Sequence, residues 1–416
     1  MRAAPDTEPL AADRPKAEDA PPPQRKRWSP SRLLILLLAI AFFSVPGLAY
    51  LAGARPEQLE NRPLSPRPSL TEGWGIFGHL NRWTSDHVPL RGSAVRANAA
   101  IDEKVFDEPP AYGTGGRSDV IAAPHGWLFW AQDLQWACTP TTPVPTILRN
   151  ATRLARMVRA TGANYVLLVP PDKTSIETEE LPSRYPNKAC SQAAKKAFWA
   201  QTTAAPPQGY ADLYHPLLAL RAQAGRSIYK PKDTHWAPLA AGLYARTVVD
   251  AAEPGLWQPG AFVPVGQVTE IGDLTRFTGI SADNTYDGWQ VRRPGVRAYP
   301  EIPYQPGKVG KIGIAGLTAT SSQGARLSPA PTLVLGDSFN GVSQSQVSPY
   351  FADITSVSIN TAPKDAHDVA RMILDSRFVV VESVERAFAT GRAPLFSTAF
   401  LDSLQRQINA QQRSRR

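Results

Sequence analysis

Ser338 lies in a stretch of sequence whose residue types suit nucleophilic chemistry. The apolar run from Thr332 to Leu335 predicts a buried strand, and Gly336-Asp337 directly after it predicts a sharp turn. This turn would place Ser338 at the carboxyl end of the strand, where α/β folds carry their reactive groups. Because a serine hydroxyl is a weak nucleophile by itself, the chemistry requires a nearby base, usually a histidine oriented by a carboxylate.

Asp233 and His235 provide such a pair upstream of the serine. In a Ser-His-Asp mechanism, His235 would accept the serine proton, while Asp233 would orient the imidazole ring and stabilise the imidazolium. A short predicted strand at 227–229 precedes the pair, and the Ala- and Leu-rich segment 237–250 after it predicts a helix. The structural alternative is that Asp233 caps this helix, since aspartate is a preferred N-cap residue.

A second Asp-x-His sequence, Asp365-Ala366-His367, follows the serine. It leads directly into a predicted helix at 369–374, so we interpret it as a helix N-terminus. The expected base is therefore His235 and not His367.

The Gly336-Asp337-Ser338-Phe339 motif and the upstream Asp233-Thr234-His235-Trp236 motif together resemble the SGNH-hydrolase-like domain of the alginate O-acetyltransferase AlgJ/AlgX family. In that family the Asp-x-His motif precedes the serine motif, as it does here. Further segments of the same resemblance extend through most of the chain: Glu60-Asn61-Arg62, residues 86–91, Gly126 to Phe129, Val169 to Lys173, Gly272-Asp273-Leu274 and Glu385-Arg386.

The resemblance implies a fold, a reaction and a partner. The fold would be a three-layer α/β/α domain whose motif order is permuted relative to ordinary SGNH hydrolases. The reaction would be O-acyl transfer, most simply O-acetyl transfer, to an exported or cell-wall polysaccharide through an acyl group on Ser338. The acyl donor would come from a membrane-bound O-acyltransferase. Two alternatives remain: an esterase that removes acyl groups, and a non-catalytic protein that binds a wall polymer.

Three residues are further candidates for contacts with the substrate or with the reacting oxygen. The usual SGNH oxyanion-hole motifs are not recognisable, which leaves the Ser338 backbone N–H and, as a second candidate, Asn340. Lys173 would emerge at the same sheet edge as Ser338 if their strands are parallel, and it could hold an anionic acceptor or cap its loop. Trp127 could stack on a sugar ring or simply belong to a hydrophobic strand at 126–130.

Residues 33–52 form an uncharged apolar run, long enough for a helix to cross the ~30 Å hydrocarbon core of a membrane. Basic residues just before this run predict a cytoplasmic N-terminus and an extracytoplasmic remainder, in a single-pass protein of the cell membrane. These residues are Arg25, Lys26, Arg27 and Arg32. A cleaved signal peptide is the alternative, because Ala52-Gly53-Ala54 has the form of a cleavage site. We expect a retained anchor, because the apolar run exceeds the about 7 to 15 residues of a signal core.

The chain divides into five predicted regions. They are a disordered cytoplasmic tail (1–32), the transmembrane anchor (33–52), an extracytoplasmic lead-in (53–110), the catalytic domain (111–400) and a polar basic tail (401–416). Within the catalytic domain, a predicted helix at 147–161 and a buried strand at 165–169 show the alternation typical of α/β folds. The Pro- and Gly-rich stretch 253–330 predicts a long irregular excursion or a variable lobe.

The composition limits the classes of partner and cofactor. The chain has 416 residues, of which 43% are hydrophobic, so it can bury a sizeable core. Its net charge of +9 suits an anionic membrane surface or wall polymer better than nucleic acid, because no nucleic-acid recognition motif accompanies the charge. The histidines lack the spacing of metal ligands, and neither a GxGxxG nor a P-loop motif is present. We therefore expect no metal and no nucleotide cofactor.

Cys138 and Cys190 are the two cysteines of the chain. In an exported domain, the oxidising compartment favours a disulfide between them. Two separate buried thiols are the alternative.

Overall fold

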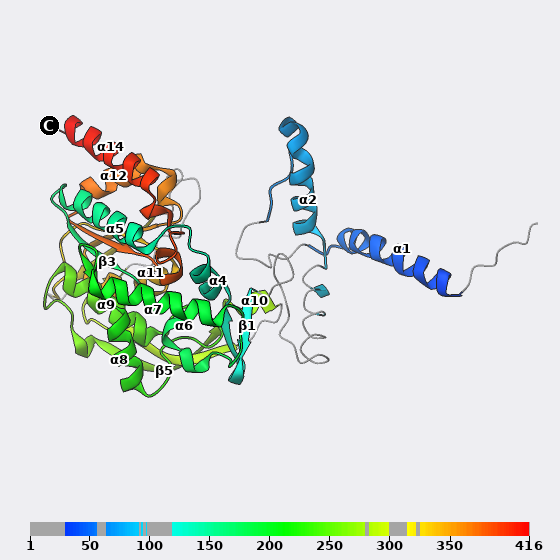
Figure 1. Ribbon diagram of the computed structural model, residues 1–416, viewed down its shortest axis with the longest axis horizontal. Coiled ribbons are helices and arrows are strands. Elements are labelled where there is room, and N and C mark those ends of the chain that lie inside the picture. Colours follow the sequence, from blue (N-terminus) through cyan, green and yellow to red (C-terminus); the bar gives the residue numbers. More distant parts are fainter. Residues whose placement is uncertain are drawn as a thin grey trace, which may run out of the picture. The chain divides into compact units, whose positions relative to one another are not determined.

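Figure 1 shows the computed structural model, which describes residues 30–55, 64–90, 93, 94, 97, 119–278, 283–298, 314–321 and 325–415. The chain divides into two compact units. One contains helices α1 and α2, and the other contains the described residues from Ser93 onward. The predicted tail up to residue 29 and the predicted domain boundary at residues 110–111 lie outside the described residues.

The first unit contains the apolar run. Helix α1 (Pro30–Leu51) covers nearly all of the predicted segment 33–52, and its length and composition would allow it to cross a membrane. The 3-10 helix η1 (Leu70–Gly75) leads directly into helix α2 (Ile76–His87). Near the end of α2, the buried Asp86 carboxylate accepts hydrogen bonds from the backbone N–H and the hydroxyl of Ser65, at 3.0 and 2.5 Å. Asp86 therefore anchors the chain ahead of η1.

The second unit is built on a seven-stranded sheet with the strand order β4-β3-β11-β9-β10-β8-β7. Its parallel strands are β4 (Tyr210–Ala211), β3 (Asn164–Leu168), β11 (Phe378–Glu382), β9 (Thr332–Gly336) and β10 (Asp353–Ser358). Strands β8 (Ile314–Ser321) and β7 (Val296–Ala298) extend the sheet in the antiparallel sense. Because β3, β11 and β9 are adjacent and parallel, the residues that follow them emerge along one edge of the sheet.

Side chains of the sheet alternate between two hydrophobic cores, and helices cover both faces. In β9, Leu333 and Leu335 belong to one core and Val334 to the other. The first core includes residues of α5 (Val144–Arg159), α7 (Lys188–Ala204), α12 (Ala366–Asp375) and α14 (Thr398–Ser414). The second includes residues of α8 (Tyr214–Ala224), α9 (Pro238–Ala252) and α11 (Ser338–Val347). The predicted three-layer α/β/α fold is therefore confirmed (Figure 1).

The predicted polar basic tail at 401–416 forms most of α14. Leu401, Leu404 and Ile408 are buried, and the helix packs against α12 and α5. These apolar residues recur every three or four positions among polar ones, so they form a single face of the helix. The overall composition of the segment hides that face.

The predicted irregular stretch 253–330 also contains regular structure. Strands β5 (Phe262–Ile271) and β6 (Asp283–Val291) pair as an antiparallel hairpin. The register shifts between Pro264 and Gly266, and Gly266 has a φ of +86°, which glycine adopts without strain. Proline and glycine thus mark a β-bulge here and do not exclude a strand.

The prediction of a strand at 227–229 is wrong. Tyr229 makes a single antiparallel bridge with Trp236, and residues 230–235 form the connecting loop. Asp233 and His235 therefore lie on a loop that other parts of the fold must hold. We call residues 230–236 the base loop.

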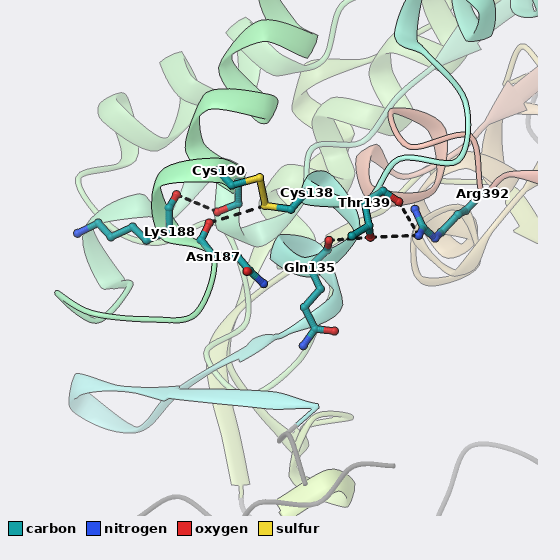
Figure 2. Close-up of a disulfide and its surroundings, with 8 residues drawn as sticks. Gln135, Cys138, Thr139, Asn187, Lys188, Cys190 and Arg392 are labelled. Atoms are coloured by element: carbon teal, nitrogen blue, oxygen red, sulfur yellow. Dashed lines mark hydrogen bonds between the residues drawn. A yellow bond between two sulfur atoms is a disulfide. The ribbon is translucent and has the colours of Figure 1, made fainter. Parts of the chain in front are cut away.

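Figure 2 shows the disulfide between Cys138, at the end of α4 (Gln132–Cys138), and Cys190 in α7, with their Cα atoms 5.7 Å apart. Beside it, a side-chain nitrogen of Arg392 donates to the Thr139 carbonyl at 2.7 Å. The carboxyl end of α4 is thus attached both to α7 and to the segment that follows β11.

Candidate active site

The turn after β9 presents Ser338 as the first residue of α11. Asp337 is the N-cap of this helix, because its Oδ1 accepts a hydrogen bond from the Phe339 N–H at 2.9 Å. Its Oδ2 accepts from the Val384 N–H at 2.8 Å, which ties the turn to the segment after β11. Ser338 is exposed, and its own N–H belongs to the first helical turn, where backbone donors have no acceptor within the helix. The strand and the turn that the sequence predicts are both present.

Glu382, which no sequence motif had indicated, is the last residue of β11 and contacts this turn. Its side chain is fully buried, and its Oε2 accepts from the Asp337 N–H at 2.8 Å. Burial, followed by the nearby Asp337 carboxylate, raises the pKa of Glu382 well above its usual value. A Cβ on Gly336 would lie 2.9 Å from the same oxygen and 2.7 Å from Asn340 Cβ, so only glycine fits at this position. An acidic residue at the end of the otherwise apolar strand was the signal in the sequence.

Asp233 and His235 form a hydrogen-bonded pair on the base loop. Asp233 Oδ1 accepts from His235 Nδ1 at 2.7 Å and from the His235 backbone N–H at 2.9 Å. Burial opposes ionisation of this carboxyl, but the hydrogen bond and the charge of His235 lower the pKa of Asp233 below its usual value. Helix α9 begins with Pro238, and its N-cap residue Ala237 makes no side-chain cap, so Asp233 does not cap it.

The second ring nitrogen of His235 is the atom that could act as a base. Nε2 is buried and has no hydrogen-bond partner among the described residues. Because Nδ1–H donates to Asp233, Nε2 of the neutral ring carries the lone pair. The ring centroid lies 5.0 Å from that of Phe339, the residue after Ser338. The fold therefore brings the base loop against the start of α11, which carries the serine.

His367 lies elsewhere. It is part of α12, where Asp365 caps the helix by accepting from the Asp368 N–H at 3.1 Å. The His367 ring contacts Gln407 of α14. The second Asp-x-His sequence is thus a helix N-terminus, as predicted.

The Lys173 side chain is hydrogen-bonded to the backbone of the base loop. Its Nζ donates to the carbonyl oxygens of Lys230, Pro231 and Asp233, at 3.0, 3.0 and 2.7 Å. Burial lowers the pKa of Lys173, whereas nearby carboxylates and the three accepting carbonyls favour its charged form. The side chain is only 1% exposed and its donors are used. Of the two predicted roles, this geometry fits the cap of a loop and leaves no donor for an anionic acceptor.

Trp127 belongs to the packing around Lys173. It lies in strand β2 (Trp127–Trp130), which pairs with β1 (Val120–Ala123), and it is buried. The Lys173 ammonium lies 5.2 Å from its ring centroid and 5.0 Å from that of Phe129. Leu128 of the same hairpin donates its N–H to the Pro231 carbonyl at 3.0 Å. This position favours the structural role of Trp127 over a contact with sugar.

Both polar atoms of the Asn340 side-chain amide make hydrogen bonds. Its Oδ1 accepts from the Tyr244 hydroxyl at 3.0 Å, and its Nδ2 donates to the Ser356 hydroxyl at 2.9 Å. The residue is buried between α9, α11 and β10. We therefore assign it to packing, and the Ser338 N–H stays the candidate for the oxyanion donor.

Asp273 approaches the base loop from the end of β5. Its backbone N–H donates to Asp233 Oδ2 at 3.1 Å, and its carboxylate accepts from the Thr234 N–H and hydroxyl at 2.8 and 2.6 Å. Asp233, His235 and Asp273 each place one possible metal-ligand atom within 4.8 Å of the others. Because these atoms already make hydrogen bonds within the loop, we assign them to the orientation of the imidazole and not to a cation.

A largely buried network of charged side chains lies near the turn that carries Ser338. Lys195 donates to Asp172 at 2.8 Å and to Glu385 at 3.1 Å, and Arg386 donates to Asp172 at 2.9 Å. Glu385 and Arg386 therefore belong to one network through shared partners. The Arg386 guanidinium lies 5.6 Å from the Phe339 ring centroid, which connects this network to the serine helix.

The model of the SGNH hydrolase-like domain of acetyltransferase AlgX matches residues 120–300. This range contains the β1–β2 hairpin, the base loop and Asp273, and it ends before Ser338. Over this range the chain is similar to the AlgX domain.

Curated AlgJ proteins match part of the chain. The probable alginate O-acetylase AlgJ of Pseudomonas putida is 25% identical to this chain over 203 residues, or 46% of each protein. The protein of the same name from Pseudomonas fluorescens is 25% identical over 209 residues, which make up 47% of this chain and 50% of that protein. The chain thus matches no more than half the length of these two relatives.

Solved structures with a similar arrangement include the O-acetyltransferase domain of Pseudomonas putida AlgJ, with a TM-score of 0.43 and 19% identity over 70% of this chain and 99% of that domain. Pseudomonas aeruginosa AlgX has a TM-score of 0.45 and 14% identity, over 75% of this chain and 70% of AlgX. Bacillus cereus PatB1 has a TM-score of 0.46 and 12% identity, over 68% of this chain and 100% of PatB1.

Proposed function

We propose that this protein is an O-acetyltransferase that acylates an exported or cell-wall polysaccharide through an acyl group on Ser338. The observation that carries the proposal is the Asp233–His235 pair, whose ring lies 5.0 Å from that of Phe339, next to the exposed Ser338. The match to an acetyltransferase domain supports the same class of reaction.

The reaction would proceed in two halves. In the first, the Ser338 hydroxyl attacks the acyl carbonyl of the donor as His235 Nε2 accepts its proton, and the proton then passes to the leaving group as that bond breaks. In the second, a sugar hydroxyl gives its proton to His235 and attacks the acyl-serine ester, and His235 returns that proton to Ser338 Oγ as the ester bond to the enzyme breaks. Asp233 keeps Nδ1 as the donor and stabilises the imidazolium, while the Ser338 N–H would stabilise the oxyanion.

Transfer and hydrolysis share the first half of this mechanism. They differ in whether a sugar hydroxyl or water takes the acyl group, so positioning of the acceptor and exclusion of water decide the outcome. An exported polysaccharide as the acceptor is favoured by the names of the AlgJ relatives and by an apolar helix that suits a membrane span. In this proposal α1 anchors the protein, and a membrane-bound O-acyltransferase supplies the acyl group.

The test is acyl transfer by the full-length protein in detergent, with an aryl acetyl ester as donor and uronate and neutral oligosaccharides as acceptors. We expect acetylated sugar from the wild type, and its loss in Ser338→Ala and in His235→Ala. His367→Ala is the matched control and should keep full activity. Free acetate as the sole product with every acceptor, together with a gain of acetate on the cell's glycan after deletion of the protein, would establish an esterase instead.

A further inference from the structure

We propose that Asp273 is a positioning residue of this site, which holds the base loop through Thr234 and Asp233 and adds a second carboxylate beside the imidazole. The inference rests on the proposed function, in which His235 is the base. Nothing in the Ser-His-Asp pattern requires this residue, and it lies 38 positions after His235 on a different element.

Asp273 uses three groups to hold the loop. Its N–H occupies Asp233 Oδ2 at 3.1 Å, which leaves Asp233 Oδ1 to His235. Its own two carboxylate oxygens accept from the Thr234 N–H and hydroxyl, at 2.8 and 2.6 Å. The same aspartate thus holds both residues that directly precede His235, so the loop has little freedom to turn the imidazole ring.

The charge of Asp273 also lies close to the imidazole. Its Oδ2 is 3.6 Å from His235 Nδ1, and the Thr234 hydroxyl lies 3.2 Å from the same nitrogen. When His235 takes the serine proton, an anion at this distance stabilises the positive ring. The His235 side chain is only 12% exposed, so water screens this interaction less than at a free surface.

The end of the β5–β6 hairpin is shaped for this close approach. A Cβ on Gly272 would lie 2.1 Å from the Lys232 carbonyl oxygen, so only glycine allows the two backbones to meet. The Leu274 N–H donates to that oxygen at 3.2 Å, and Asn284 of β6 accepts from the Lys232 N–H at 3.0 Å. These backbone contacts therefore fix the position of Asp273 relative to the base loop.

The experiment compares Asp273→Asn and Asp273→Ala in the full-length protein, with Asp283→Asn as the control. Asp283 is an exposed carboxylate at the start of β6 on the same hairpin. Asparagine keeps the size of the side chain and an acceptor for Thr234, but it removes the charge. We expect kcat on the acetyl ester to fall about tenfold in Asp273→Asn and about a hundredfold in Asp273→Ala, with KM within a factor of about two in both.

The rate at which a serine-reactive fluorophosphonate labels Ser338 should fall in the same order, since this probe reports activation of the hydroxyl without an acceptor. Asp283→Asn should match the wild type in both assays. Wild-type rates in Asp273→Asn would overturn the inference, and this isosteric variant decides the matter even if Asp273→Ala unfolds. If His235→Ala also retains wild-type labelling, the assignment of the base is at fault, which separates the two failures.

Discussion

Lys173 connects the end of β3 to the base loop without facing solvent. Its substitution by methionine would remove a donor from three carbonyl groups, and the Asp233 carbonyl would keep no other donor among the described residues, at a cost of about 1 to 3 kcal/mol. We predict that Lys173→Met lowers the free energy of unfolding by at least about 2 kcal/mol and reduces acyl transfer by more than tenfold, because Asp233 loses a fixed position. Urea unfolding and kcat test this. Lys196→Met, at the exposed neighbour of Lys195 in α7, should change neither quantity.

Glu382 provides a prediction about pH. Its pKa is raised in the folded protein above the ordinary value of 4.5, so the folded state keeps a proton that the unfolded chain releases as the pH rises. The contribution of Glu382 to stability is therefore fully present below about pH 4.5 and declines as the pH rises toward its raised pKa. We predict that Glu382→Gln, which cannot ionise, becomes more stable relative to the wild type as the pH rises from about 4.5 toward the raised pKa of Glu382. Unfolding free energies from pH 4 to 8 test this, and a pH-independent difference would contradict it.

Helix α14 provides a test of packing. Leu404 of α14 is fully buried and belongs to the first core. We predict that Leu404→Ala lowers the free energy of unfolding by about 2 to 5 kcal/mol through lost burial and the cavity left behind. Arg406→Ala, two positions later on the exposed side, should stay within about 0.5 kcal/mol of the wild type. Equal effects of the two substitutions would mean that this helix is not packed in solution.

The elements that the sequence predicted well are those with strong local patterns. Strand β9 is a fully buried apolar run that ends at a turn, and α5 buries residues at helical spacing. The hairpin β5–β6 was missed because many of its side chains are exposed, which leaves no clear alternation. The amphipathic face of α14 was missed because the polar residues dominate its composition.

The contacts of the candidate site also differ in whether a local sequence pattern could predict them. Asp233 and His235 are two positions apart, so the motif itself indicates their pairing. The contacts of Lys173 with carbonyls 57 to 60 positions later, and those of Asp273 with residues 39 and 40 positions earlier, depend on how separate elements meet. No local pattern encodes such contacts, since the accepting groups are backbone carbonyls or loop atoms common to every sequence.

The disulfide links α4 and α7 across 52 positions of the chain. By the chain-entropy estimate, closing such a loop stabilises the folded protein by about 4 kcal/mol. We predict that peptides of the unreduced protein, isolated from membranes, contain Cys138 joined to Cys190. Cys138→Ser with Cys190→Ser should lower the unfolding free energy by a similar amount. Two thiols that alkylate freely without reductant would refute the pairing.

The arrangement of the whole molecule across the membrane is the remaining prediction. Because Arg25, Lys26, Arg27 and Arg32 precede the apolar run 33–52, most of which lies in α1, we expect an N-terminus in the cytoplasm and the second unit outside, with the anchor retained. A phosphatase reporter that folds only outside the cytoplasm, fused after residue 416, should be active, and a reporter that works only in the cytoplasm should be inactive there. The mature protein should also keep an N-terminal epitope tag in the membrane fraction. Loss of that tag would show cleavage, and activity of the cytoplasmic reporter would reverse the orientation.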